Sequence, residues 1–214
     1  MIAALSSYSI FIPGFIALIR YSHIKNNYHP FIYLIWIGSI NEVISRLLIW
    51  KGHFSILNNN IYFLLEALMI TWFFMKMDNI ILRRKMFVTL MILFTVAWMI
   101  NMVYINKPSE PVFYFNIFYS FCIVLMSISS LNYLLIQDAT PLRRQPLFWI
   151  YSGFILYFTL SVILHAFWLF GLNRSTKFLF QVAAILEWLN LFINLIYAYA
   201  FLWIPKKQPS LLHY

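Results

Sequence analysis

Two side chains of opposite charge lie inside a stretch of the sequence that is otherwise apolar. Glu42 and Arg46 are four residues apart within the run 31–50, so they share one face of a helix. In the hydrocarbon of a membrane each such charge costs roughly 2.5–3.5 kcal/mol on insertion scales. Pairing, hydration or a bound ligand must offset that cost, which makes these residues candidates for a functional site.

Other polar residues follow helical spacing in three further apolar runs. The candidate ligand-binding or polar cluster comprises Glu42, Arg46, Tyr62, Glu66, His165, Glu187, Asn190 and Asn194. Three carboxylates in this set face one arginine and one titratable histidine, so one or two acids must be protonated, hydrated or paired with a ligand cation. We expect the cluster to lie in the outer half of the membrane, and Arg46 to contact Glu66 as well as, or instead of, Glu42.

The elements that would position these residues are membrane-spanning helices. The chain is 63% hydrophobic and 10% charged, whereas a soluble domain carries about 25% charged residues. A spanning helix needs about 20 apolar residues, and seven segments qualify: 4–20, 31–50, 60–77, 86–105, 112–136, 147–171 and 178–204. The sequence therefore predicts an all-α polytopic membrane protein, with one seven-helix bundle over residues 1–205 and a short cytoplasmic tail at 206–214.

Basic residues in the predicted loops indicate how the chain is oriented. Ten Lys and Arg fall on one side of the predicted membrane and four on the other. The positive-inside rule then places the N-terminus outside and the C-terminus in the cytoplasm, in agreement with an odd number of spans. Residues 1–19 carry no charged side chain and show no cleavage pattern, which predicts an uncleaved first helix. Topology accounts for the net charge of +9, so we expect the lipid bilayer, not nucleic acid, as the partner.

The sequence does not contain the motifs of several common kinds of metal, redox and phosphate chemistry. Cys122 is the single cysteine, so the chain can form no intramolecular disulfide or thiolate cluster. No HExxH motif or Gly-rich phosphate loop occurs, and His165 is interpreted as a satisfied buried histidine in preference to a metal ligand. We therefore predict no metal and no cofactor, and we favour a non-enzymatic role. The whole cluster has a structural alternative, in which Arg46 neutralises a carboxylate and Asn190 and Asn194 join helices.

Three short stretches carry a resemblance to a known group of proteins. They are FWIYSGFILY at 148–157, NLFINLIYA at 190–198 and YFLLE at 62–66. These stretches resemble poorly characterised seven-helix bacterial membrane proteins, which occur alone or as the N-terminal sensor half of histidine kinases. The resemblance implies a sensory or accessory role in a bacterial inner membrane. No kinase part follows in this sequence, so it also implies that output requires a cytoplasmic signalling partner or a membrane complex.

These observations lead to one expected function and three alternatives. The expected function is an integral membrane sensor or signalling-accessory protein with a polar outer-half pocket for a small ligand or a partner helix. A proton-coupled transporter would use the carboxylates and His165 as a relay. A membrane enzyme acting on lipid would use a carboxylate and His165 as acid and base. A structural subunit of a membrane complex would use the polar residues as an interface.

Overall fold

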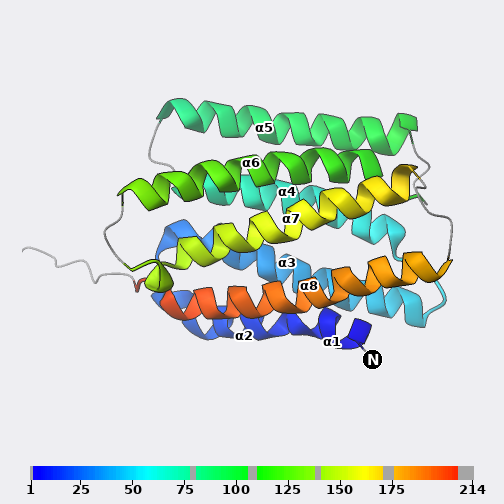
Figure 1. Cartoon of the computed structure of the whole chain (residues 1–214), viewed down its shortest axis with the longest axis horizontal. Helices are drawn as coiled ribbons and strands as arrows, with labels where there is room; N and C mark the ends of the chain where they lie inside the picture. Colours follow the sequence, from blue (N-terminus) through cyan, green and yellow to red (C-terminus); the bar gives the residue numbers. More distant parts are fainter. Residues whose placement is uncertain (1, 78–80, 106–109, 138–140, 171–175, 207–214) are drawn as a thin grey trace, which may run out of the picture.

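The chain folds into helices that run along one common direction (Figure 1). A computed structural model describes residues 2–77, 81–105, 110–137, 141–170 and 176–206. Its helices are α1 Ile2–Ser9, α2 Phe11–Arg20, α3 His29–Trp50, α4 Ile56–Met77, α5 Ile81–Ile100, α6 Phe113–Gln137, α7 Pro146–Phe170 and α8 Thr176–Trp203. A wider π-helical turn, Asn101–Ile105, extends α5. Of the predicted tail at 206–214, Lys206 alone lies within the described residues.

Within the described residues, six helices are long and apolar enough to cross a membrane, which makes the chain a multi-pass membrane protein by helix length and composition. They correspond to the second to seventh predicted segments, so the all-α prediction and these six segments are confirmed. The largest shift at a helix start is in α5, which begins at Ile81 where 86 was predicted. α4 begins at Ile56, four residues before the predicted position. This shift changes the depth of Glu66 in the bundle.

The first predicted segment, 4–20, forms two shorter helices instead of one. Pro13 has no backbone N–H, so it cannot bond the Ser9 carbonyl four residues earlier. The chain turns at Ile10 between α1 and α2, and helical bonding resumes where the Gly14 N–H meets the Ile10 carbonyl at 3.1 Å. Neither piece alone is long enough to span a bilayer.

The helices pack side by side, with α5 at one edge of the bundle and α1 and α2 at the other (Figure 1). α8 packs against α1, α2 and α7, while α3 packs against α4 and α6 packs against α7. The end at which α2, α4, α6 and α8 finish is here called the basic end. It carries Arg20, Lys25, Lys76, Arg84, Lys85, Arg143, Arg144 and Lys206. The other end is called the opposite end.

Contacts at the basic end join α2 to the end of α8. The Arg20 guanidinium donates to the carbonyl of Phe201, and its second nitrogen donates to the carbonyl of Ile204 at 3.0 Å. These carbonyls have no partner within a helix, and an arginine at the helix C-terminus satisfies them. The Lys25 N–H also donates to the Pro205 carbonyl at 3.4 Å, so the chain beyond α8 is held against the loop that follows α2.

Packed aromatic rings fill the bundle on the basic-end side of its middle. We call this group the aromatic cluster; it consists of Phe31, Phe73, Phe74, Tyr151 and Phe201. The Phe31 ring lies 5.1 Å from that of Phe201, and Phe74 stacks on Tyr151 at 5.4 Å. All five side chains are at most 3% exposed, so four helices close the bundle at this level.

Candidate functional site

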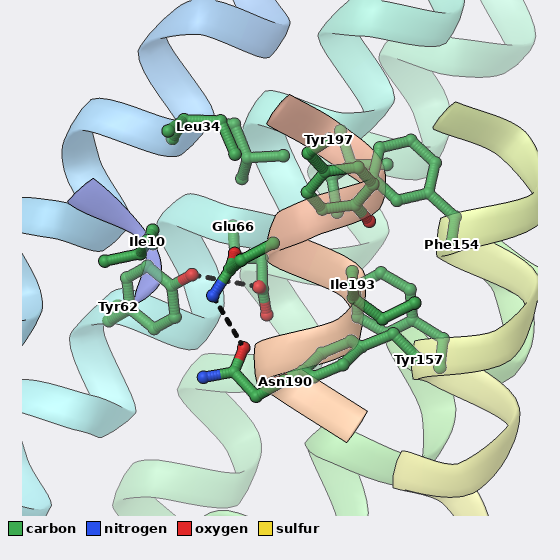
Figure 2. A pocket seen from close by; sticks show the side chains of 13 residues that line it. Ile10, Leu34, Tyr62, Glu66, Phe154, Tyr157, Asn190, Ile193 and Tyr197 are labelled. Carbon is green, nitrogen blue, oxygen red and sulfur yellow. Dashed lines mark hydrogen bonds between the residues drawn. The ribbon is translucent and has the colours of Figure 1, made fainter. Parts of the chain in front are cut away.

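A cavity of about 50 Å³ lies in the middle of the bundle, among α3, α4, α7 and α8 (Figure 2). Its polar lining comes from six side chains: Tyr62, Glu66, Tyr157, Asn190, Asn194 and Tyr197. Ile10, at the turn between α1 and α2, closes one side, and Leu34 and Phe154 are among the apolar lining residues. Four residues of the predicted cluster therefore meet at one cavity: Tyr62, Glu66, Asn190 and Asn194.

Glu66 is the one carboxylate that lines this cavity among the described residues. Its side chain is 6% exposed. The Tyr62 hydroxyl donates to Oε1 at 3.0 Å, and the Tyr119 hydroxyl donates to Oε2 at 2.7 Å. A carboxylate offers about four acceptor positions, so two hydroxyl groups fix its orientation and leave capacity for further donors.

Arg46 lies away from Glu66, against the first helix. Its Nη2 donates to the Ser7 hydroxyl at 2.9 Å, and its Cζ lies 5.8 Å from the centre of the Tyr8 ring. Within the described residues, neither Glu66 nor Glu42 forms an ion pair with Arg46. The predicted contact between Arg46 and Glu66 is therefore wrong.

The offset between α3 and α4 explains this error. Ser45 on α3 donates to the Asn59 side chain at 3.1 Å, so the residue next to Arg46 is level with Asn59. Glu66 is seven residues further along α4, which is about 10 Å nearer the basic end. The sequence interpretation began α4 at residue 60, whereas the helix begins at Ile56 and so carries Glu66 a turn deeper.

His165 belongs to a separate contact between α6 and α7. Its Nε2 lies 3.2 Å from Nδ2 of Asn116, and its Nδ1 lies 2.7 Å from the Ser161 carbonyl. Both ring nitrogens have partners, as in the interpretation of a satisfied buried histidine. His165 does not line the cavity, so the structure does not bring it together with Glu66.

An open cleft of about 210 Å³ adjoins the cavity on the side of the opposite end. It is lined by Ser6, Ser7, Tyr157, Leu186, Glu187 and Asn190. Tyr157 and Asn190 line both spaces, so these side chains lie at the boundary between the cleft and the cavity. The predicted residue Glu187 thus lies in the cleft, outside the cavity that contains Glu66.

Hydrogen bonds from α8 to α1 form the wall beside this boundary. The Asn194 amide donates to the Ser9 hydroxyl at 2.8 Å and to Oδ1 of Asn190 at 3.4 Å. The Asn190 amide donates to the Ser6 hydroxyl at 3.3 Å. The sequence interpretation missed both serines, although their spacing of three in an apolar run is a helical signal.

Two glycines allow cavity side chains to approach neighbouring helices closely. A Cβ at Gly38 would lie 2.6 Å from Cδ1 of Ile10 and 3.3 Å from the Tyr62 hydroxyl. A Cβ at Gly153 would lie 2.5 Å from Cε1 of Tyr197. Real Cβ contacts are essentially never as short as 2.5 or 2.6 Å, so the glycines let Ile10 approach α3 and Tyr197 approach α7. The 3.3 Å contact with Tyr62 is tighter than nine in ten real Cβ contacts.

The site offers acceptors and aromatic faces more than reactive groups. Among the residues that the structure describes, no three His, Cys, Asp or Glu side chains are grouped to hold a metal ion. A buried carboxylate with tyrosine donors, next to amide oxygens, can bind a hydrogen-bond donor or a cation. Binding is therefore the chemistry that this geometry supports.

Comparisons of the chain with protein families, with curated proteins and with solved structures found no match. The similarity to bacterial sensor modules therefore stays a prediction from the three short stretches. The geometry of the cavity and the cleft provides the argument for function.

Proposed function

We propose that the chain is a multi-pass membrane receptor or signalling-accessory protein that binds a small polar molecule at the cavity and cleft beside Glu66. The observation that carries this proposal is the buried Glu66 carboxylate, which faces a cavity that an open cleft adjoins. Polar and ionisable groups inside membranes are costly, and they mark binding sites and ion pathways. A few polar groups that converge within a mostly apolar lining are typical of a ligand site, and here the cavity and the adjoining cleft together provide the space.

The closed basic end favours binding over transport. The cavity residues Glu66, Phe154 and Tyr197 are each followed toward the basic end, within about two turns, by members of the aromatic cluster on the same helix. A permease needs access to the site from both sides in turn, whereas this bundle has its cleft on one side and packed rings on the other. A receptor needs access from one side only.

The proposed topology makes the cleft accessible from outside the cell. α1 and α2 together cover residues 2–20, or roughly 28 Å of helix, which approaches the thickness of the hydrocarbon core. We count them as a seventh span, with the basic end in the cytoplasm of a bacterial cell by the positive-inside rule. The N-terminus and the cleft then face the exterior.

α8 provides a route by which binding could be detected in the cytoplasm. Its Asn190, Asn194 and Tyr197 line the cavity, and its last carbonyls are bonded by Arg20 at the basic end. A ligand with different affinities for two positions of α8 would shift the population between them. A cytoplasmic partner that contacts the basic end would read the shift.

Ligand-dependent stabilisation tests the proposal. The purified full chain in lipid nanodiscs would be heated with a panel of small amines, carboxylic acids, amino acids and sugars. Any compound that binds the folded state raises the unfolding midpoint. We expect at least one class to do so, and its effect to be lost in Asn190→Leu.

Asn116→Leu is the matched control. Asn116 also joins two helices through its amide, at His165, but it lines neither the cavity nor the cleft. We expect the ligand effect to persist in this variant. A panel without a stabilising compound, or equal stabilisation of Asn190→Leu and the wild-type protein, would refute the proposed function.

A further inference from the structure

The geometry points to a small primary ammonium compound as the ligand of the cavity, with Glu66 as its counter-ion. This inference rests on the proposed binding function and specifies the chemistry that the site selects. Four features carry it: unused acceptors, a carboxyl group without an ion pair among the described residues, aromatic walls and the shape of the two adjoining spaces.

The polar atoms that line the cavity include acceptors with unused capacity, beside the hydroxyls of Tyr157 and Tyr197, which can donate as well as accept. Two tyrosine hydroxyls occupy only part of the acceptor capacity of Glu66. Both hydrogen bonds of the Asn194 side chain use its amide nitrogen. Its carbonyl oxygen therefore accepts none from the described residues. A primary ammonium has three N–H donors and no acceptor, as in a lysine side chain, which complements this set.

Charge selects a cation over a neutral donor. Within the part of the chain that the structure describes, the Glu66 carboxylate has tyrosine partners and no ion pair, while Arg46 is bonded to Ser7. An ionised carboxylate at this depth needs a positive partner, because burying a charge alone costs several kcal/mol. Glu187 adds a second carboxylate to the cleft, and the Arg46 guanidinium, bonded to the cleft residue Ser7, is the cation near it.

Aromatic side chains surround the carboxylate. The aromatic residues that line the cavity are Tyr62, Tyr157, Tyr197, Phe154 and Phe158. Figure 2 shows the rings of Tyr62, Phe154, Tyr157 and Tyr197 around the space beside Glu66. The face of an aromatic ring attracts a cation, by about 0.5–2 kcal/mol depending on its desolvation. Carboxylate and rings together stabilise an organic ammonium more than they stabilise an anion.

The dimensions limit the size of the group that enters. About 50 Å³ holds roughly three or four water-sized groups, enough for an ammonium and one or two carbon atoms. The remainder of a short chain would pass Tyr157 and Asn190 and occupy the cleft of about 210 Å³. A quaternary ammonium is broader and has no N–H to donate, so the site would discriminate against it.

Isothermal titration of the full chain in nanodiscs with n-propylammonium tests the inference. The comparison compounds are tetramethylammonium, which has the charge without donors, and n-propanol, which has a donor without charge. We expect saturable binding of n-propylammonium and at least ten-fold weaker binding of both comparison compounds. We expect Glu66→Gln to weaken n-propylammonium binding at least ten-fold.

Two further variants keep the test decisive. Glu110→Gln removes an equal charge from an exposed position at the opposite end and should change the affinity less than two-fold. Leu34→Phe fills the cavity without altering charge and should abolish binding; it decides the question if Glu66→Gln does not fold.

Three results would overturn the inference: no binding of n-propylammonium, equal binding to Leu34→Phe, or equal binding of tetramethylammonium. If another class in the compound panel then shows stabilisation that depends on Asn190, the receptor function stands and only the ligand class is wrong. If no class does, both proposals fail.

Discussion

The contact between Gly153 on α7 and Tyr197 on α8 permits a test of how the cavity wall is built. A Cβ on residue 153 would lie 2.5 Å from Cε1, 3.2 Å from Cζ and 3.3 Å from the hydroxyl oxygen of the tyrosine. The tyrosine ring cannot easily move aside, because it packs 5.1 Å from the Phe31 ring and 5.9 Å from the Phe154 ring. Gly153→Ala should therefore force α7 and α8 apart or displace the ring.

The expected magnitude is a balance of two terms. Overpacking a well-filled interior costs about 1–3 kcal/mol, while replacing glycine by alanine inside a helix recovers about 1 kcal/mol. The net loss of unfolding free energy should thus reach about 2 kcal/mol. Gly14→Ala is the matched control, because its nearest neighbour is the rotatable Ser39 hydroxyl at 3.3 Å. The two variants should differ by about 1–3 kcal/mol.

Reversible unfolding by SDS in mixed micelles would measure these differences. The Tyr197→Ala background removes the ring, so adding Gly153→Ala to it should be neutral or slightly stabilising. The coupling between the two substitutions would then be about 1–3 kcal/mol, as for residues in direct contact. If Gly153→Ala is as stable as Gly14→Ala, or if the substitutions are additive, the close approach of these helices is refuted.

Three further predictions concern contacts elsewhere in the bundle. Asn60 donates to the Glu110 carbonyl at 2.9 Å and accepts from the Val112 N–H at 3.3 Å. Asn60→Ala removes both hydrogen bonds and should lower the free energy of unfolding in SDS by about 1–2 kcal/mol. An unchanged free energy would contradict the role of Asn60 in holding the start of α6. Tyr119→Phe removes one of the two donors to the Glu66 carboxylate and should lower the free energy of unfolding in SDS by about 1–3 kcal/mol. Tyr114→Phe is the control, because Tyr114 is exposed, and it should leave this free energy unchanged. Arg20→Met should destabilise the last turn of α8 by about 1 kcal/mol, so the amide hydrogens of that turn should exchange roughly five times faster. Unchanged exchange rates would argue against the link between α2 and α8.

The long helices could be predicted because length and apolar composition are sufficient to define them. A run of about 20 apolar residues has few alternatives in a membrane, where backbone groups must bond within the segment. The break in the first segment is less predictable. Pro13 indicates a disturbed helix, but the position of the turn at Ile10 depends on bonds that Ser9 and Gly14 form in the folded chain.

Part of the candidate site could also be predicted from spacing along single helices. Tyr62 and Glu66 are four residues apart on α4, and their side chains bond as that spacing implies. Asn190 and Asn194 have the same separation on α8 and also bond. Tyr119 gave no such signal, because it reaches Glu66 from another helix, 53 residues away.

The sequence by itself determined which residues share a helix face, because 3.6 residues per turn is a local property of the backbone. The tertiary structure alone decided which faces meet and at what depth. The packing of the helices placed Arg46 beside Ser7, Glu66 beside Tyr119 and His165 beside Asn116. The physical reason is that the offset and rotation of neighbouring helices depend on close packing, such as that at Gly38 and Gly153, which no single segment encodes.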